Sequence, residues 1–435
     1  MSLRAILLLI ALVPCVPICF FRPYFGVLAW TVISFASPQW YAWGAAYYFP
    51  SAELIAIPTI LGFVFFSNGW TRIFSRESFL ILLLWAWFTI TSIVATGTPM
   101  LDSHTTETWF RYQFVSKILL MVFLTMGIVD SFARLRTVIM VTAGCFTFYV
   151  VKALPWMVMT AGSFRLYGPP KSMVEDNNDL ALALNMTLPM LFFLAQTETD
   201  RRLKRLFWFL FVAVIFGVLC TYSRGGLVGL VAVMILMILQ LRQRVVLMPV
   251  MILAIIVVAL FAPEQWRDRM NLTSKEATLD KSAYSRINAW TFSWRLAQDY
   301  PITGGGFETF QRELFDRYAP NPADVHGPHS IYFGVLAEHG FVGLALYLAL
   351  IASCFASTWR IRRIARRLGD DVAAGYAYML QFSLIAFLVS GLFLGRAYFD
   401  YFFTIVCFIV ILKRECFASW RRMDAVPQSS AEAAA

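Results

Sequence analysis

The sequence predicts an all-α membrane protein with many spans, and three observations support this fold class. The chain has 435 residues, of which 59% are hydrophobic and only 14% are charged, whereas about 25% of residues are charged in soluble domains. Apolar runs long enough to cross a bilayer recur along most of its length. In lipid the backbone must satisfy its own hydrogen bonds, so these runs are expected to be helices. Composition therefore excludes a soluble globular enzyme.

The apolar runs define twelve or thirteen spans, because the first two are short enough to form one hairpin. They are residues 4–21, 24–37, 53–68, 77–96, 115–130, 134–155, 179–196, 205–221, 226–241, 245–262, 330–354, 373–394 and 398–413. We therefore expect about 12 transmembrane helices and four regions. These are N-terminal transmembrane helices (1–262), a large outer loop (263–329), C-terminal transmembrane helices (330–415) and a cytoplasmic tail (416–435).

Basic residues gather in alternate loops between the spans, and this pattern sets the expected orientation. They are Arg72, Arg76, Arg134, Arg136, Arg201, Arg202, Lys204, Arg205, Arg242, Arg244, Arg360, Arg362, Arg363, Arg366, Arg367, Lys413, Arg414, Arg421 and Arg422. The positive-inside rule assigns these loops and the C-terminus to the cytoplasm. The net charge of +10 thus reflects topology, which argues against nucleic-acid binding. The seven cysteines show no metal-binding spacing.

The segment 263–329 is by far the longest connection, and loops of this size are usually functional. Within it, "SAYSRINAWTFSWRLAQDYP" has helical apolar spacing, and "ETFQRELFDRY" predicts a second, amphipathic helix that suits a membrane surface. The glycine-rich "TGGGF" separates the two. We expect this loop to be ordered and to face outward.

Arginines are the candidate anion-binding residues at the outer ends of the spans. Arg224, in "TYSRGG", has almost no loop around it; a charge at that depth usually faces a cavity or partner, although an interfacial arginine reaching lipid phosphate fits too. Arg286 and the nearby Tyr284 begin an aromatic helix, where an ordinary surface arginine is the alternative. Arg396 lies in a very short loop and resembles Arg224.

A second outward loop adds Arg165 and Lys171. The acidic and amide residues that follow, Asp176 to Asp179, favour helix capping. Several arginines converging on one face suit a diphosphate, because the guanidinium fork matches pairs of phosphate oxygens.

Three of the four histidines fall in one stretch, "VHGPHSIYFGVLAEHGFVG". His329 stands where loop meets helix, a position that suits a general base near neutral pH. His326 also fits a solvated loop residue, and His339, about ten residues into the helix, also fits packing between helices. The stretch lacks an HExxH pattern, so no metal site is predicted.

These motifs resemble the O-antigen ligase/polymerase superfamily. In its signature a His, then Asn or Ser, precedes about nine residues and G-x-x-G, and the match here is His329, Ser330, Gly340 and Gly343. The stretches "TYSRGG" and "YSRINAW…DYPITGGGF" are similar to the same family and keep its order. The best fit within it is the lipopolysaccharide O-antigen ligase, and the "EHG" variant is similar to exosortase-associated O-glycosylation ligases.

The resemblance implies a GT-C-like glycosyltransferase in the bacterial inner membrane with its active site facing the periplasm. Its essential residues carry over to Arg224, Arg286 and His329, with Arg165, Lys171, Arg396, His339, His326 and Tyr284 expected to bind substrate. Which of His329 and His339 is the base stays open, and His329 is preferred. The implied reaction ligates a glycan from undecaprenyl diphosphate onto lipid A–core with inversion, without metal or other cofactor.

Three alternatives accompany this interpretation. O-antigen polymerase and protein O-oligosaccharyltransferase share the donor chemistry and differ only in the acceptor. A transporter or flippase for the lipid-linked glycan would use the same many helices and intramembrane charges. The oligomeric state is left open by the sequence.

Overall fold

The computed structural model describes residues 3–41, 49–99, 101, 104–240, 244–261, 266 and 276–424. Within these residues every regular element is a helix, which confirms the all-α fold class. The helices are α1 (Leu3–Phe21), α2 (Pro23–Phe35), η1 (Pro38–Tyr41), α3 (Ser51–Phe66), η3 (Gly69–Ile73), α4 (Arg76–Thr96), α5 (Thr105–Ile128), α6 (Phe132–Met159), α7 (Asn177–Thr197), α8 (Arg201–Cys220), α9 (Arg224–Leu239), α10 (Arg244–Phe261), α12 (Glu276–Asp299), α13 (Arg312–Tyr318), α14 (Ile331–Leu368), α15 (Asp371–Ser390) and α16 (Asp400–Asp424).

Each predicted apolar segment falls on one of helices α1 to α10 or α14 to α16. Among the described helices, seven are long and apolar enough to cross a membrane, namely α4, α5, α6, α7, α8, α14 and α15. Helices α1, α2, α3, α9 and α10 are shorter and also apolar. The chain is therefore a multi-pass membrane protein.

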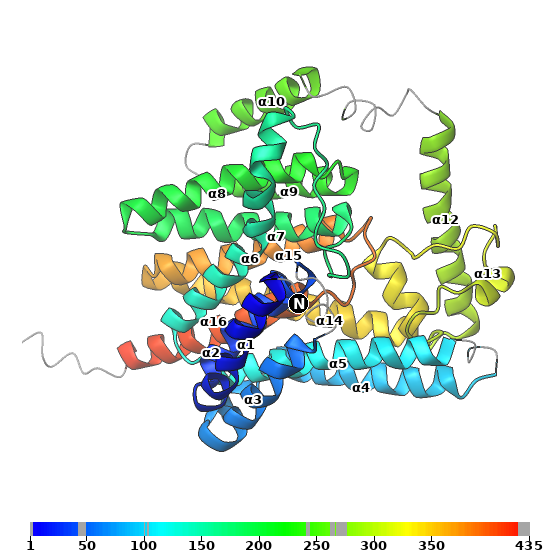
Figure 1. Cartoon of the computed structure of the whole chain (residues 1–435), viewed down its shortest axis with the longest axis horizontal. Coiled ribbons are helices and arrows are strands. Elements are labelled where there is room, and N and C mark those ends of the chain that lie inside the picture. The colour runs from blue at the N-terminus through cyan, green and yellow to red at the C-terminus, as the bar shows by residue number, and fades with distance from the viewer. Residues whose placement is uncertain are drawn as a thin grey trace, which may run out of the picture.

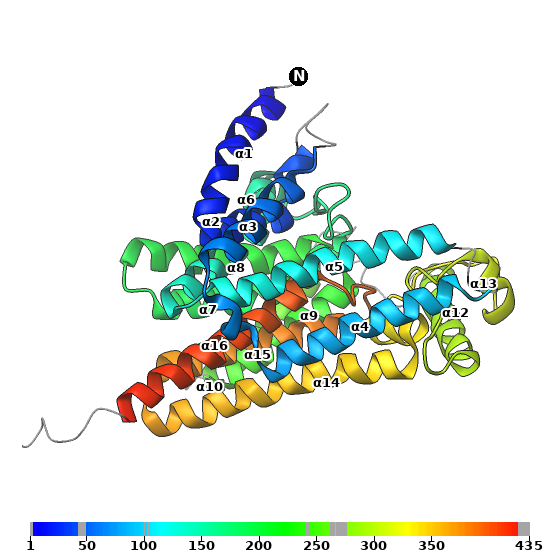
Figure 2. The same ribbon diagram turned by 90° about the horizontal axis from the view of Figure 1, so that it is seen from below.

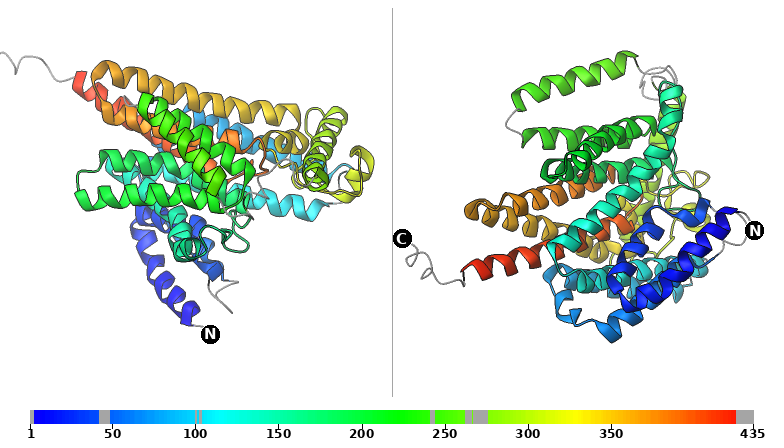
Figure 3. Two further views of the ribbon diagram at one scale, coloured as in Figure 1. Left: turned by 90° about the horizontal axis from the view of Figure 1, so that it is seen from above. Right: turned by 60° about the vertical axis from the view of Figure 1, so that its left-hand side comes forward.

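Helix α7 lies at the centre of the bundle and packs against α6, α8, α9 and α15. Its residues from Leu180 to Leu191 are all buried, as expected for a helix that is apolar on every side. Helices α1 to α3 pack together on one flank, and α9 and α10 lie on the opposite flank (Figures 1 and 3).

Helix α14 links the two ends of the bundle. Its 38 residues form two helical segments that join at Gly340. Helices α12 and α13 lie beyond one end of the bundle, next to the start of α14, whereas the basic segment Arg360–Arg367 lies at its other end, near the end of α16 (Figure 2). We call these the loop end and the basic end.

Some predicted boundaries differ from the structure. The amphipathic helix begins at Arg312 rather than Glu308, because Glu308 has a positive φ of 59° and its N–H donates to Glu338 instead of starting a helix. Arg224 is the first residue of α9 and not part of a loop. Helix α16 continues to Asp424, into the predicted tail; the rest of that tail and residues 267–275 of the large loop lie outside the described residues.

Candidate functional site

His329 occupies the turn that leads into α14. Its φ is +44°, a region that residues other than glycine seldom adopt and that is enriched at functional sites. The next two residues fix this turn: Ser330 is the N-cap of α14, and the Ile331 N–H donates to the Gly391 carbonyl at 2.9 Å. Part of the His329 surface stays accessible to solvent. The fold thus presents His329 at the surface of the loop end.

Helix α12 brings Arg286 to this turn. Trp290, one helical turn beyond Arg286, donates from its indole to the Pro328 carbonyl at 2.7 Å. The Trp290 ring also stacks on Phe333 of α14, with 5.1 Å between ring centroids. Asn288 donates to the Asn321 carbonyl at 2.9 Å. These contacts hold the helix that carries Arg286 against the segment that carries His329.

The electrostatic surroundings of His329 favour its neutral form. Its pKa is lower than the ordinary value, first because the surrounding protein displaces water from the ring and second because Arg286 carries a positive charge nearby. Arg396 and His326 act in the same direction, and Asp176 opposes them. A neutral imidazole can accept a proton at neutral pH, which general-base catalysis requires.

Arg396 reaches the site from the connection between α15 and α16, residues 391–399. A side chain at Gly395 would lie 3.5 Å from the His329 nitrogen, so the two backbones are adjacent. The Arg396 guanidinium pairs with Asp179 in the first turn of α7 at 2.6 Å. Asp179 therefore holds Arg396 beside the His329 turn.

The start of α9 places the backbone of Arg224 at the same end. Ser223 caps the helix by accepting from the Gly226 N–H at 2.9 Å. Gly226 lies directly against Ala181 of α7, where an added Cβ would be 2.5 Å from the Ala181 Cβ, and Gly225 faces Phe393 at 3.4 Å. The backbone of Arg224 thus lies between α7 and the segment 391–399.

Arg165 belongs to a strap that ties these helix ends together. It donates to Asn177 Oδ1 at 2.9 Å, and the Asn177 amide donates to the Thr221 carbonyl at 2.8 Å. Lys171 lies farther out, exposed, with its ammonium 5.8 Å from the Trp40 ring centroid. Arg165 is therefore close to the starts of α7 and α9, and Lys171 belongs to the rim.

Three helix N-termini, those of α7, α9 and α14, meet at this place through the contacts described above. The N-terminal end of a helix carries a partial positive charge and free N–H groups, so it favours anions. The four arginines Arg165, Arg224, Arg286 and Arg396 outnumber the three carboxylates that act on His329 or Arg396, which are those of Asp176, Asp179 and Glu308. The arrangement can therefore bind a multiply charged anion next to a neutral imidazole.

The remaining predicted residues have different positions. Tyr284 is exposed on α12, two residues before Arg286. His326 is exposed and pairs with Asp324 at 3.3 Å. His339 is fully buried: its Nδ1 bonds Thr91 at 2.8 Å, and its ring lies 4.3 Å from the Phe88 centroid. The structure thus brings His326 near His329 and leaves Tyr284 on the surface of α12, while His339 lies inside the protein.

The G-x-x-G part of the signature has a backbone function. Gly340 interrupts α14 with φ 67° and ψ −170°, and Phe341 N–H donates to the Pro301 carbonyl at 2.9 Å. A Cβ at Gly343 would lie 2.3 Å from the His339 Cβ. The turn 301–306 thereby packs into the break and supports the first segment of α14, which begins after His329.

Glu338 and Tyr398 form a buried link that the sequence analysis did not identify. Tyr398 donates to Glu338 Oε2 at 2.5 Å, and the Glu308 N–H donates to Oε1 at 2.9 Å. Glu308 also pairs with Arg111 of α5 at 3.4 Å. Glu338 thus joins the segment 391–399 to the large loop. A carboxylate within the apolar run "YFGVLAEHGFVG" was the available signal, because such residues are costly in membranes.

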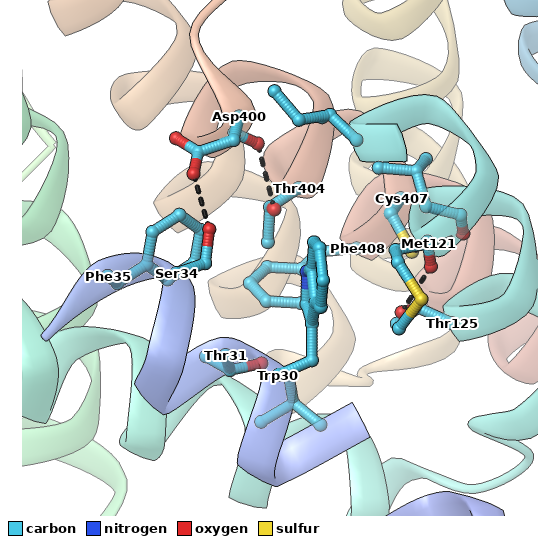
Figure 4. A pocket seen from close by; sticks show the side chains of 13 residues that line it. Trp30, Thr31, Ser34, Phe35, Met121, Thr125, Asp400, Thr404, Cys407 and Phe408 are labelled. Atoms are coloured by element: carbon cyan, nitrogen blue, oxygen red, sulfur yellow. Dashed lines mark hydrogen bonds between the residues drawn. The ribbon is translucent and has the colours of Figure 1, made fainter. Parts of the chain in front are cut away.

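Asp400, the residue that follows the segment 391–399, provides a further anchor close to Tyr398. It is buried at the start of α16 and accepts from the Ser34 hydroxyl of α2 at 2.6 Å, at the edge of a small cavity (Figure 4). The segment that carries Arg396 is therefore fixed at Gly391, which accepts from the Ile331 N–H, and again at Tyr398 and Asp400. Within the described residues, no group of three or more His, Cys, Asp or Glu side chains is arranged to hold a metal ion.

Comparisons with known proteins found matches over two parts of the chain. Residues 209–348 match the O-antigen ligase family, and residues 3–199 match a family of unknown function (DUF5935). The first match contains Arg224, Arg286 and His329, whereas Arg396 lies beyond it. Among curated proteins, none matches this chain.

Proposed function

We propose that this chain ligates O-antigen onto lipid A–core. The match of residues 209–348 to the O-antigen ligase family supports a membrane glycosyltransferase of the O-antigen ligase/polymerase type. The donor in this proposal is an undecaprenyl diphosphate glycan. The observation that carries it is the meeting of His329, Arg286 and Arg396 beside three helix N-termini at one end of the bundle.

In the proposed mechanism, neutral His329 accepts the proton of the acceptor hydroxyl as its oxygen attacks the anomeric carbon. The bond from that carbon to the diphosphate oxygen breaks, and its electron pair leaves with the diphosphate. A direct displacement of this kind inverts the anomeric centre. General-base assistance typically contributes about 10²- to 10⁴-fold in rate.

The cations at the loop end would stabilise the leaving diphosphate. Arg286 and Arg396 have their charges close to His329, and the arginine fork suits phosphate oxygens. Charge that is already in position when the leaving group develops lowers the barrier without reorganisation. Arg224 and Arg165 are assigned to the same task, Lys171, His326 and Tyr284 to the rim of the acceptor site, and His339 to packing.

The basic residues support an orientation with the loop end outside the cytoplasm. Arg360, Arg363, Lys413 and Arg414 all lie at the basic end, which the positive-inside rule assigns to the cytoplasm. The candidate site at the opposite end then faces the periplasm in an inner membrane. Both lipid reactants would reach it from the same leaflet, which removes much of the entropic cost of bringing them together.

Reconstitution tests this function. We expect the protein in liposomes, given purified undecaprenyl diphosphate glycan and lipid A–core, to extend lipid A–core, as gel shift and mass spectrometry would detect. Exhaustive EDTA treatment should leave the rate unchanged, because arginines rather than a metal neutralise the diphosphate. The Arg286→Ala variant is the matched inactive control.

Other results would identify the alternatives. Extension of the donor glycan itself would indicate a polymerase, and glycosylation of an added acceptor protein would indicate an oligosaccharyltransferase. Movement of the donor across the bilayer without product would indicate a flippase. Loss of activity in EDTA that Mg²⁺ or Mn²⁺ restores would refute the metal-free mechanism.

The lowered pKa of His329 predicts a pH profile. Protonated histidine cannot act as a base, so kcat/KM should fall as the pH drops through the pKa of His329, with a midpoint below the ordinary histidine value. Replacing Arg286 by Gln removes a positive charge that disfavours the imidazolium. The midpoint should then move to higher pH, in addition to the loss in rate. An unchanged midpoint in Arg286→Gln would contradict the proposed proximity.

A further inference from the structure

A cavity lined by cations lies at the basic end, far from the candidate active site. It has a volume of about 590 Å³ and lies between α4, α14 and α16. This volume is within the range of about 300–1,000 Å³ that small-molecule sites occupy. Its lining includes Arg76, Arg360, Arg363, Arg367, Lys413 and Trp359.

The cations come from three helices and face one space. Arg360, Arg363 and Arg367 are spaced by three and four residues, so they share one face of α14. Arg76 is the first residue of α4, and Lys413 belongs to α16. The cavity is thus a site built where helices meet, and not a run of charge along a single loop.

Only part of this charge is compensated within the described residues. Glu77 is fully buried and pairs with Lys413 at 2.5 Å and with Arg76 at 3.3 Å. It also accepts from the Ser357 hydroxyl at 2.7 Å. The other three cations, Arg360, Arg363 and Arg367, have no described carboxylate within ion-pairing distance. One carboxylate among five cations leaves a strongly positive cavity.

Aromatic rings support the arginines and mark the depth of the site. The guanidinium of Arg363 lies 5.5 Å from the Trp359 ring centroid, and that of Arg360 lies 5.0 Å from Phe417. The Trp359 side chain is 55% exposed. Exposed tryptophan at the end of a membrane helix is typical of the headgroup region.

We propose that this cavity binds the phosphate headgroup of an anionic phospholipid from the leaflet at the basic end. Arginine pairs well with phosphate oxygens, and basic pockets between membrane helices on the cytoplasmic side suit anionic headgroups. The bound lipid would bridge α4, α14 and α16, whose cations otherwise repel one another. The site is separate from the proposed transfer chemistry and does not depend on it.

The test measures lipid binding to the full-length, delipidated protein by native mass spectrometry, with phosphatidylglycerol and phosphatidylcholine as probes. We expect selective binding of phosphatidylglycerol. The triple variant Arg360→Gln, Arg363→Gln, Arg367→Gln should bind it at least about ten-fold more weakly, because each basic residue near a membrane surface contributes appreciably to binding anionic lipid.

The matched control is Arg201→Gln, Arg202→Gln, Arg205→Gln in the exposed first turn of α8. It removes the same charge at the same end of the bundle but leaves the cavity intact, so phosphatidylglycerol affinity should change little. Equal losses in both triple variants, equal binding of phosphatidylcholine, or full displacement by inorganic phosphate would each overturn the proposal. If the cavity variant does not fold, the single Arg363→Gln substitution serves as the test, with about three-fold weaker binding expected.

Discussion

Replacing His329 by alanine is expected to reduce the rate of glycan transfer by about 10²- to 10⁴-fold, the usual contribution of a general base. Among the described histidines at the loop end, His329 is exposed, lies close to Arg286 and has no acidic partner in an ion pair, whereas the nearby His326 pairs with Asp324. The substitution therefore removes the candidate base. The fold should persist, because His329 lies at the protein surface, with part of the residue accessible to solvent. Single-turnover transfer with both substrates saturating is the measurement.

Two controls separate chemistry from structure. His326→Ala alters the same turn three residues earlier, but His326 pairs with Asp324, so the rate should change only a few-fold. His329→Asn retains a side chain that tolerates positive φ but cannot accept a proton at neutral pH. It should be as inactive as His329→Ala. Recovery of activity in His329→Asn would mean that the backbone conformation and not the imidazole matters.

The fold class could be predicted from the sequence, whereas contacts between residues distant along the chain could not. Long apolar runs and alternating basic loops are local signals, so the spans could be recognised one by one. The pairing of Arg396 with Asp179 joins residues more than 200 positions apart. No local periodicity reports such a contact, and Asp179 looked like a helix cap.

The two histidines show the same limit. His329 and His339 both stand near the start of an apolar helix, so residue type and spacing could not separate them. Burial does: His339 is enclosed by Phe88, Phe307 and Thr91, whereas His329 is accessible. The choice depends on how the turn 301–306 and α4 pack against α14, which is a tertiary property.

Replacing Gly340 by alanine is expected to give the largest loss of stability. Its φ of 67° and ψ of −170° lie in a region that is essentially restricted to glycine, with a cost of about 1–3 kcal/mol for other residues. A Cβ would also lie 2.4 Å from the Ile302 carbonyl oxygen, so backbone must move. Each kcal/mol of lost stability usually lowers Tm by about 2–4 °C in mid-sized domains, so Tm should fall by about 5 °C or more.

Two other glycines serve as controls that separate the cost of backbone strain from the cost of the Cβ clash. Gly369 also has a positive φ, 71°, but an added Cβ meets nothing within 4 Å, so Gly369→Ala measures backbone strain without a clash. Gly144 lies within α6 with equally open surroundings, and Gly144→Ala should be neutral or stabilising. The Tm measured by thermal unfolding in detergent should therefore be lowest for Gly340→Ala, higher for Gly369→Ala and highest for Gly144→Ala.

The turn 301–306 packs against the break at Gly340. Of the three variants, only Gly340→Ala should therefore lose transfer activity as well as stability. A Gly340→Ala protein as stable as Gly369→Ala would show that the added Cβ is accommodated without a clash, and full transfer activity in it would show that the break in α14 does not support the His329 turn.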